Sequence, residues 1–130
     1  MLMSLPADGS LAVLNMFQFN RKAKYQPEDP EYGTDAAEVS GKEAFQRYSA
    51  IAGKAITDLG GRTVVSAAVE QVLIGPDTAA WDMVAIMYFP TRGGFLQMMA
   101  NPDFRLASRH RKAALANHRM IHLVGDNFAI

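Results

Sequence analysis

Two runs of the sequence, Leu11–Phe19 and residues 81–89, are apolar at nearly every position. Successive side chains of a β-strand point to opposite faces of its sheet, so a strand covered on one side alternates apolar and polar residues. Neither run alternates in this way, and we expect both strands to be covered on both sides. A chain of 130 residues has room for only two or three helices, which can cover one side. A second copy of the chain is expected to cover the other side.

A helix is predicted to begin after Ser40. Ser40 and Glu43 have the spacing of a capping box, in which each side chain bonds to the other residue's backbone N–H. Apolar residues then recur every three or four positions as far as Leu59, before a glycine pair that is typical of a helix end. The polar stretch 20–39 before this helix is predicted to be a long loop, and a mobile surface excursion is favoured over a lid on a pocket.

The rest of the chain predicts four further elements. Residues 62–74 are rich in β-branched side chains and indicate an edge strand, which the apolar strand at 81–89 follows. Thr91 and Asn101 are expected to cap two successive helices, and Leu106 and His110 are expected on the apolar face of the second. A last strand is predicted at 118–124, closed by a turn at 125–127.

This order of elements is the ferredoxin-like βαββαβ pattern of an α+β protein. It predicts a four-stranded antiparallel sheet with helices on one face, in a single domain spanning residues 1–130. Right-handed crossovers place the first and third strands at the centre of the sheet. Those are the two runs that are apolar on both sides, so periodicity and topology agree.

Composition argues against several classes of function. Thirteen basic and thirteen acidic residues cancel, so no net charge is available to attract nucleic acid or an anionic membrane surface. The chain has no cysteine, which excludes disulfides, thiol nucleophiles and zinc–thiolate sites. The N-terminal stretch does not resemble a signal peptide or a membrane span, so a cytoplasmic protein is expected.

The histidines do not predict a metal site. His118 and His122 are four residues apart on a predicted strand, which separates them by roughly 13 Å along one face. Together with His110 they lack an accompanying group of carboxylates. The pair Gly93 and Gly94 lacks the lysine and the spacing of a phosphate-binding loop, and no nucleotide or other cofactor is predicted.

With its elements laid out in this way, the chain resembles the dimeric α+β barrel superfamily. Within that superfamily it is similar to the uncharacterised bacterial proteins of family DUF1330, whose name denotes a domain of unknown function. The matching segments, which cover most of the chain, read LNMFQF, AKY, SGKEAFQRY, WD, YFP, FLQM, NPDF and RHR. The resemblance implies a homodimer whose two sheets face each other. The wider superfamily includes cofactor-independent monooxygenases, small-molecule isomerases, haem-degrading enzymes and ligand-binding proteins, so the resemblance does not fix a reaction.

Asn15 and His110 are the candidate catalytic residues. Asn15 is a polar residue in the middle of the most apolar strand, where an unpaired amide costs roughly 1–3 kcal/mol. A structural hydrogen bond to a helix or loop is favoured, and the alternative is that the amide orients a ligand carbonyl or enolate. His110, on the apolar side of a predicted helix, is a candidate proton carrier. A half-buried histidine bonded to the backbone is favoured over this role.

Five further residues are candidate ligand contacts. The aromatic side chains of Tyr48, Trp81 and Tyr88 are candidates to shape a pocket, although packing alone explains each, and Trp81 also fits a dimer interface. Arg109 and Arg111 flank His110 and are candidates to attract a carboxylate. Their alternative is that both are solvated helix charges.

Three functions remain open from the sequence. The first is an enzyme without metal or nucleotide that acts on an apolar or aromatic compound by oxygenation or proton transfer. The arginines would allow this compound to carry a carboxylate. The second is a non-catalytic dimeric binding module, and the third is a structural homodimer without a functional cavity. A single cavity that contains Asn15, Tyr48 and His110 is the observation that would favour the enzyme.

Overall fold

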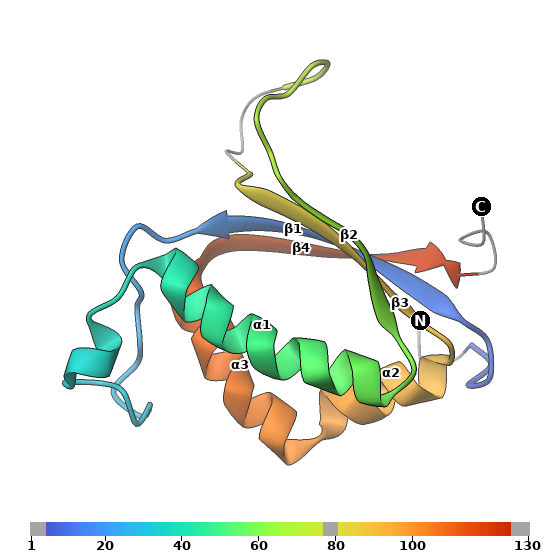
Figure 1. Cartoon of the computed structure of the whole chain (residues 1–130), viewed down its shortest axis with the longest axis horizontal. Coiled ribbons are helices and arrows are strands. Elements are labelled where there is room, and N and C mark those ends of the chain that lie inside the picture. The colour runs from blue at the N-terminus through green and yellow to red at the C-terminus, as the bar shows by residue number, and fades with distance from the viewer. Residues whose placement is uncertain (1–4, 77–80, 126–130) are drawn as a thin grey trace.

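The computed structural model describes residues 5–76 and 81–125 of the chain. Three helices lie on one face of a four-stranded antiparallel sheet, and no described helix lies on the other face (Figure 1). In chain order the elements are β1 (Leu11–Phe19), the 3₁₀ turn η2 (Asp35–Ala37), α1 (Gly41–Asp58), β2 (Arg62–Ala68), β3 (Met83–Phe89), α2 (Arg92–Ala100), α3 (Pro102–Ala114) and β4 (Leu115–Val124).

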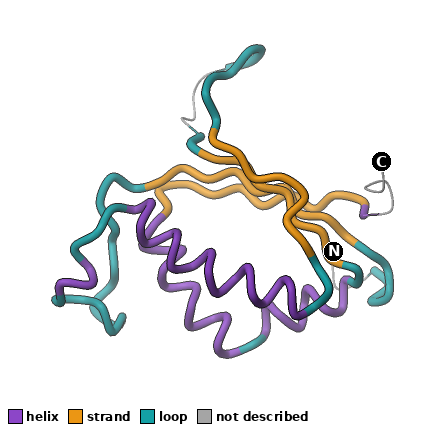
Figure 2. The backbone as a smooth tube through the Cα atoms, viewed as in Figure 1, coloured by secondary structure: helices purple, strands orange, loops and turns teal. Residues whose placement is uncertain are grey.

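The strand order is β2-β3-β1-β4, which confirms that the first and third strands lie at the centre. Asn15 of β1 lies opposite Ala85 of β3 on one side and Met120 of β4 on the other. Directly opposed residues of antiparallel strands place their side chains on the same face. Figure 2 shows the resulting two layers, with the strands above the helices. The predicted ferredoxin-like α+β fold is confirmed.

Each helix begins at the capping residue that the sequence predicts. The Ser40 hydroxyl accepts a hydrogen bond from the Glu43 backbone N–H at 3.0 Å, and the Thr91 hydroxyl accepts one from Gly94 at 3.0 Å. The Asn101 side chain accepts from two backbone N–H groups at the start of α3. These bonds satisfy N–H groups that the helix itself leaves without partners.

Three strand ends differ from the prediction. Strand β2 stops at Ala68 rather than at residue 74, because its pairing ends opposite Met83, the first residue of β3. Accordingly, β3 begins two residues later than predicted. Strand β4 begins at Leu115, directly after α3, rather than at His118. Of the predicted closing turn, residues 126 and 127 lie outside the described residues.

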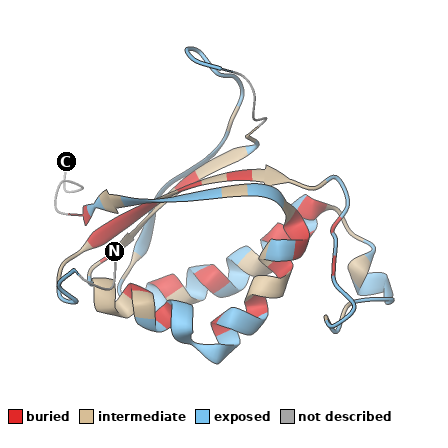
Figure 3. Cartoon of the chain, turned by 180° about the vertical axis from the view of Figure 1, so that it is seen from behind, coloured by how far each residue is buried: buried red, intermediate tan, exposed pale blue. Residues whose placement is uncertain are grey.

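The two faces of the sheet have different surroundings. The face toward the helices carries buried side chains, among them Val13, Phe17 and Phe89, which form the core with α1, α2 and α3. Figure 3 shows buried segments both in the strands and along the helices. The opposite face, here called the open face, has no described helix over it. Its large apolar side chains are only half-buried or are exposed, namely Leu14, Met16, Val65, Val84, Ile86, Tyr88, Ile121 and Leu123.

The loop 20–39 packs against the core at its beginning. Ala23 and Tyr25 are buried, and the backbone N–H of Lys24 donates to the Ala113 carbonyl of α3 at 2.9 Å. The prediction of a surface excursion is therefore wrong for Ala23 and Tyr25. Leu106 also differs from its prediction, because it is exposed while the next residue of α3, Ala107, faces the core.

Candidate functional site

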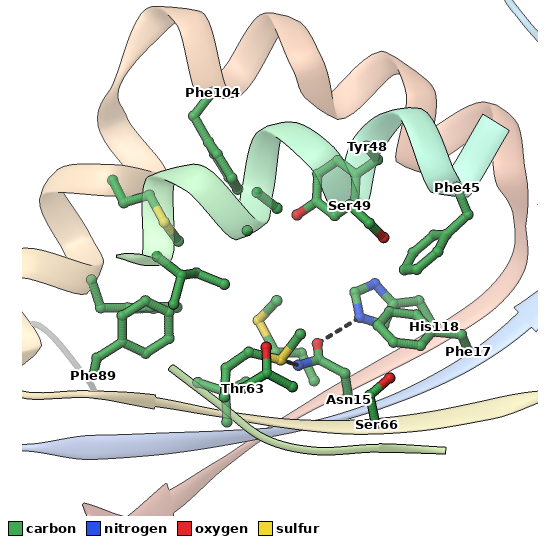
Figure 4. Close-up of a pocket in the computed structure, with 18 of the residues that line it drawn as sticks. Asn15, Phe17, Phe45, Tyr48, Ser49, Thr63, Ser66, Phe89, Phe104 and His118 are labelled. Atoms are coloured by element: carbon green, nitrogen blue, oxygen red, sulfur yellow. Dashed lines mark hydrogen bonds between the residues drawn. The ribbon is translucent and has the colours of Figure 1, made fainter. Parts of the chain in front are cut away.

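A cavity of about 200 Å³ lies between the sheet and the helices (Figure 4). Its wall is mostly apolar and contains five phenylalanines and five methionines. An apolar protein cavity of about 150 Å³ holds benzene, so this one has the volume for a substituted ring. The lining side chains that carry polar groups are Asn15, Tyr48, Ser49, Thr63, Ser66 and His118.

Asn15 reaches the cavity from the centre of the sheet. Its side chain is buried, and its Nδ2 donates to the sulfur of Met87 at 3.3 Å. Its Oδ1 lies 2.9 Å from the Nε2 of His118. The expected structural hydrogen bond is therefore present, but it joins Asn15 to a histidine on the neighbouring strand rather than to a helix or loop.

His118 lies on the same wall of the cavity, on strand β4. It is paired with Phe17 of β1, and the two ring centroids are 4.8 Å apart. Burial and the nearby charge of Arg111 lower the pKa of His118 to about 4. The imidazole is therefore neutral at pH 7.

Tyr48 faces these two residues from helix α1. Its ring lies between those of Phe45 and Phe104, with centroids 5.8 Å and 6.0 Å away. Its hydroxyl points into the cavity (Figure 4). Burial raises the pKa of this hydroxyl, and the Arg111 guanidinium partly offsets that effect. The hydroxyl keeps its proton at pH 7 and can donate it in a hydrogen bond.

The cavity opens between helix α1 and strand β2. Ser49 and Gly53 of α1 and Thr63 and Ser66 of β2 line the cavity and are also solvent-exposed. A Cβ atom placed on Gly53 meets nothing within 4 Å. This glycine in the middle of a helix therefore borders open space.

The sequence of residues 30–125 matches the family described as "Domain of unknown function (DUF1330)". The chain belongs to the DUF1330 family. This match confirms the resemblance and includes the segments from Ser40 onward, whereas the segments LNMFQF and AKY precede the matched range.

Solved structures of an uncharacterised protein are similar to this chain in sequence and in fold. The RPA0582 protein of unknown function from Rhodopseudomonas palustris is 31% identical, with a TM-score of 0.80 over 95% of this chain and 87% of that chain. A structure of methylated RPA0582 gives 32% identity and a TM-score of 0.81, over 95% and 85% of the two chains.

A more distant structure shares the fold. A dabb family protein with a ferredoxin-like fold from Mesorhizobium loti is 14% identical, with a TM-score of 0.50 over 89% of this chain and 96% of that chain. None of the curated proteins matches this DUF1330 chain.

In this DUF1330 protein, His110 does not line the cavity. It is buried on α3, where its Nδ1 lies 2.7 Å from the hydroxyl of Tyr25. Arg47 donates to the same hydroxyl at 3.0 Å, so the Tyr25 proton is left to be donated to His110. Of the three residues whose presence in one cavity would favour the enzyme, only Asn15 and Tyr48 line it. His110 instead joins Tyr25 of the loop 20–39 to α3, and Arg47 joins the same tyrosine to α1.

The two arginines beside His110 have different surroundings. Arg109 forms a two-pronged ion pair with Glu31, at 2.8 Å and 2.9 Å, and this hydrogen bonding lowers the pKa of the Glu31 carboxyl. Arg109 is therefore engaged by the loop and not available to a ligand. Arg111 is not a lining residue, but its charge acts on both Tyr48 and His118.

Trp81 and Tyr88 also lie outside the cavity lining. Tyr88 is paired with Ala12 and Arg62, which places it on the open face, and the Arg62 guanidinium lies 5.4 Å from its ring centroid. Arg119 lies 5.7 Å from the ring centroid of Trp81. Both aromatic rings thus contact arginines of the sheet rather than the cavity.

His118 is the site residue that sequence reasoning missed. It was considered only as a metal ligand together with His122, and its neighbour Asn15 is 103 positions away in the chain. The register of β4 against β1 is needed to bring the two together.

In residues 5–76 and 81–125, no group of three or more histidine, cysteine or acidic side chains is placed to hold a metal ion. No helix of the described part of the chain has the length and apolar character needed to cross a membrane.

Proposed function

We propose that this protein binds one small, mostly apolar ring compound in the cavity between its sheet and helices. The observation that carries the proposal is the pairing of a mostly apolar wall with a polar end formed by the buried Asn15 and the half-buried Tyr48 and His118. Ligand sites in proteins are usually of this kind, with a few polar groups that orient an otherwise apolar ligand.

The geometry favours binding over acid–base catalysis. A general base works best when its pKa is near the operating pH. With a pKa of about 4, His118 holds a proton poorly at pH 7 and is a weak base. His110, the other candidate, is bonded to Tyr25 and does not reach the cavity. The non-catalytic binding module therefore stands ahead of an oxygenase or isomerase.

The methionines provide a direct test. Five of the eight methionines, at positions 83, 87, 98, 99 and 120, line the cavity, whereas Met16 lies on the open face. In protein labelled with ¹³C at its methionine methyl groups, p-cresol should shift the resonances of the cavity methionines and leave that of Met16 unchanged. Absence of shifts at every methionine, or equal shifts at Met16, would contradict the proposal.

A pair of matched variants of α1 sharpens this test. Ala52 is buried and lines the cavity, whereas Ala50 is exposed on the same helix and does not line it. Ala52→Leu fills part of the cavity and should weaken p-cresol binding, whereas Ala50→Leu should leave it unchanged. Equal affinities in the two variants would place the ligand elsewhere.

We also propose that the protein forms a homodimer through the open face. The central strands carry half-buried Leu14, Met16 and Ile86 there, and no described helix covers them. The segment after β2 projects on the side away from the helices (Figure 1) and exposes Leu73 and Ile74 at 84% and 94%. On the sheet itself, Leu14 lies beside Ile86 and Ile121, and apolar surface of this kind is typical of protein interfaces. A second copy would bury it, as periodicity in the central strands predicts.

A further inference from the structure

We infer that the polar end of the cavity selects a neutral ligand with a hydrogen-bond donor, such as a phenolic hydroxyl, over the corresponding carboxylate. This inference rests on the proposed binding function and names the class of compound that the site takes. It follows from a chain of three residues, Met87, Asn15 and His118, in which each fixes the orientation or protonation of the next.

Met87 fixes the orientation of the Asn15 amide. A thioether sulfur accepts hydrogen bonds and cannot donate them. Because the Met87 sulfur lies 3.3 Å from one end of the amide, that end must be the NH₂ group. The reverse orientation would place the carbonyl oxygen against the sulfur, with no proton between them. The Asn15 oxygen is therefore turned toward His118.

Asn15 in turn fixes the tautomer of His118. The amide oxygen only accepts, and it lies 2.9 Å from the Nε2 of the imidazole. The Nε2 atom must then carry the proton and donate it. In a neutral imidazole the other nitrogen, Nδ1, consequently has a free lone pair. No described residue forms a hydrogen bond with Nδ1.

The free Nδ1 is accessible to a ligand. Figure 4 shows this nitrogen turned away from Asn15 and toward α1, on the side where Tyr48 and Ser49 face the cavity. The charged group that acts on this end is the Arg111 guanidinium of α3, and its positive charge disfavours protonation of the imidazole. Nδ1 therefore remains an acceptor in the cavity.

An acceptor at this position distinguishes between ligands. A phenol can donate its hydroxyl proton to Nδ1 while its ring occupies the apolar part of the cavity. A methyl ether of the same shape cannot donate and leaves Nδ1 without a partner, which costs binding energy in a buried site. A carboxylate presents only lone pairs to the Nδ1 lone pair and must also lose its hydration.

Three probes of similar shape test the inference, namely p-cresol, 4-methylanisole and 4-methylbenzoate, titrated calorimetrically at pH 7. We expect p-cresol to bind about tenfold or more tightly than 4-methylanisole, and 4-methylbenzoate to bind most weakly. Equal affinity of p-cresol and its ether, or tighter binding of 4-methylbenzoate, would overturn the inference while the proposed binding function stood. Absence of binding by all three probes would overturn both.

Two variants test whether Met87 orients the Asn15 amide and whether Asn15 sets the protonation of His118. Asn15→Asp places a carboxylate against Nε2, which favours the imidazolium and turns Nδ1 into a donor, so the preference should move from p-cresol toward 4-methylbenzoate. Met87→Leu keeps a similar volume but removes the sulfur acceptor, so the amide is free to reverse and the preference for p-cresol over its ether should shrink. An unchanged preference in a folded variant would contradict the mechanism.

The tautomer itself has a spectroscopic signature that needs no ligand. The ¹⁵N chemical shifts of an imidazole distinguish a protonated from an unprotonated ring nitrogen. In the wild-type protein at pH 7, Nε2 of His118 should give the signal of a protonated nitrogen and Nδ1 that of an unprotonated one. The opposite assignment would overturn the inference even if Asn15→Asp failed to fold.

Discussion

The Nε2 atom of His118 lies 2.9 Å from the Oδ1 atom of Asn15, inside the cavity and across the boundary between strands β4 and β1. Asn15 is paired with Met120 and His118 with Phe17, so the two are diagonal neighbours on one face of the sheet. Long side chains at such positions can meet. The bond therefore depends on the register of the two strands and stabilises that register in turn.

Protonation of His118 should make stability depend on pH. Its folded-state pKa of about 4 lies below the ordinary value of 6.5. Between these values the unfolded chain binds more protons, so the free energy of unfolding should fall as the pH falls from 6.5 toward 4. In urea unfolding, the free energy of unfolding should fall less between pH 7 and pH 5 for His118→Phe than for the wild type.

His110 and Glu31 also have lowered pKa values, and their protonation destabilises the fold in acid. The quantity compared is therefore the change in the free energy of unfolding between the two pH values, in each variant and in the wild type. The control is His122→Phe at the exposed end of β4, which should retain the wild-type dependence on pH. If His118→Phe lost as much stability as the wild type between the two pH values, the assignment to His118 would be wrong.

Tyr25→Phe should loosen the loop 20–39. The variant loses the hydrogen bonds to His110 and Arg47 but keeps the buried ring. We expect a loss of about 1–3 kcal/mol in the free energy of unfolding and faster limited proteolysis within the loop. Tyr32→Phe, at a tyrosine that is 54% exposed, is the matched control and should change neither quantity. Similar effects in both variants would contradict this role for Tyr25.

A larger side chain at position 53 should limit access to the cavity. Gly53→Ala places a methyl group in open space and should stabilise the helix by about 0.5–1 kcal/mol. Gly53→Phe should narrow the opening between α1 and β2 and slow the association of p-cresol, as measured by stopped-flow or NMR exchange. Ala50→Phe, on the same helix but outside the cavity lining, should leave the association rate unchanged.

The homodimer can be tested with two isoleucines of equal exposure. Ile121 lies on the open face and Ile51 on helix α1, and each is 42% exposed. Ile121→Glu should convert the dimer to a monomer in light-scattering measurements, because a charge would be buried at the interface. Ile51→Glu should leave the dimer intact. A wild-type protein that is monomeric in dilute solution would refute the proposal directly.

The sequence was sufficient for the fold because the decisive signals are local. Ser40, Thr91 and Asn101 cap their helices through hydrogen bonds within a few residues, and the nearly continuous apolar runs of β1 and β3 reflect their central positions. The ends of β2 and β4 were less predictable, because they depend on which residues of a neighbouring strand are available to pair.

The candidate site was only partly predictable. Asn15 and Tyr48 stand out as a polar residue in an apolar strand and an aromatic residue on a helix stripe, and both line the cavity. His118 does not stand out, since its neighbour Asn15 is contributed by a strand at the other end of the chain. The role of His110 is not decided by the sequence, because a histidine on an apolar helix face looks the same whether its partner is a ligand or, as here, Tyr25 of a distant loop.

The five methionines of the cavity wall have a consequence for ligand range. Methionine side chains are unbranched and polarizable, and they rotate easily into new positions. Four of them, Met83, Met98, Met99 and Met120, can adapt to compounds of differing shape, whereas Met87 accepts the hydrogen bond from Asn15 and stays with the pair formed by Asn15 and His118. Such a pocket would accept ligands that differ in their apolar part but would select for the one group that forms the hydrogen bond. Oxidants that convert thioethers to sulfoxides would impair ligand binding.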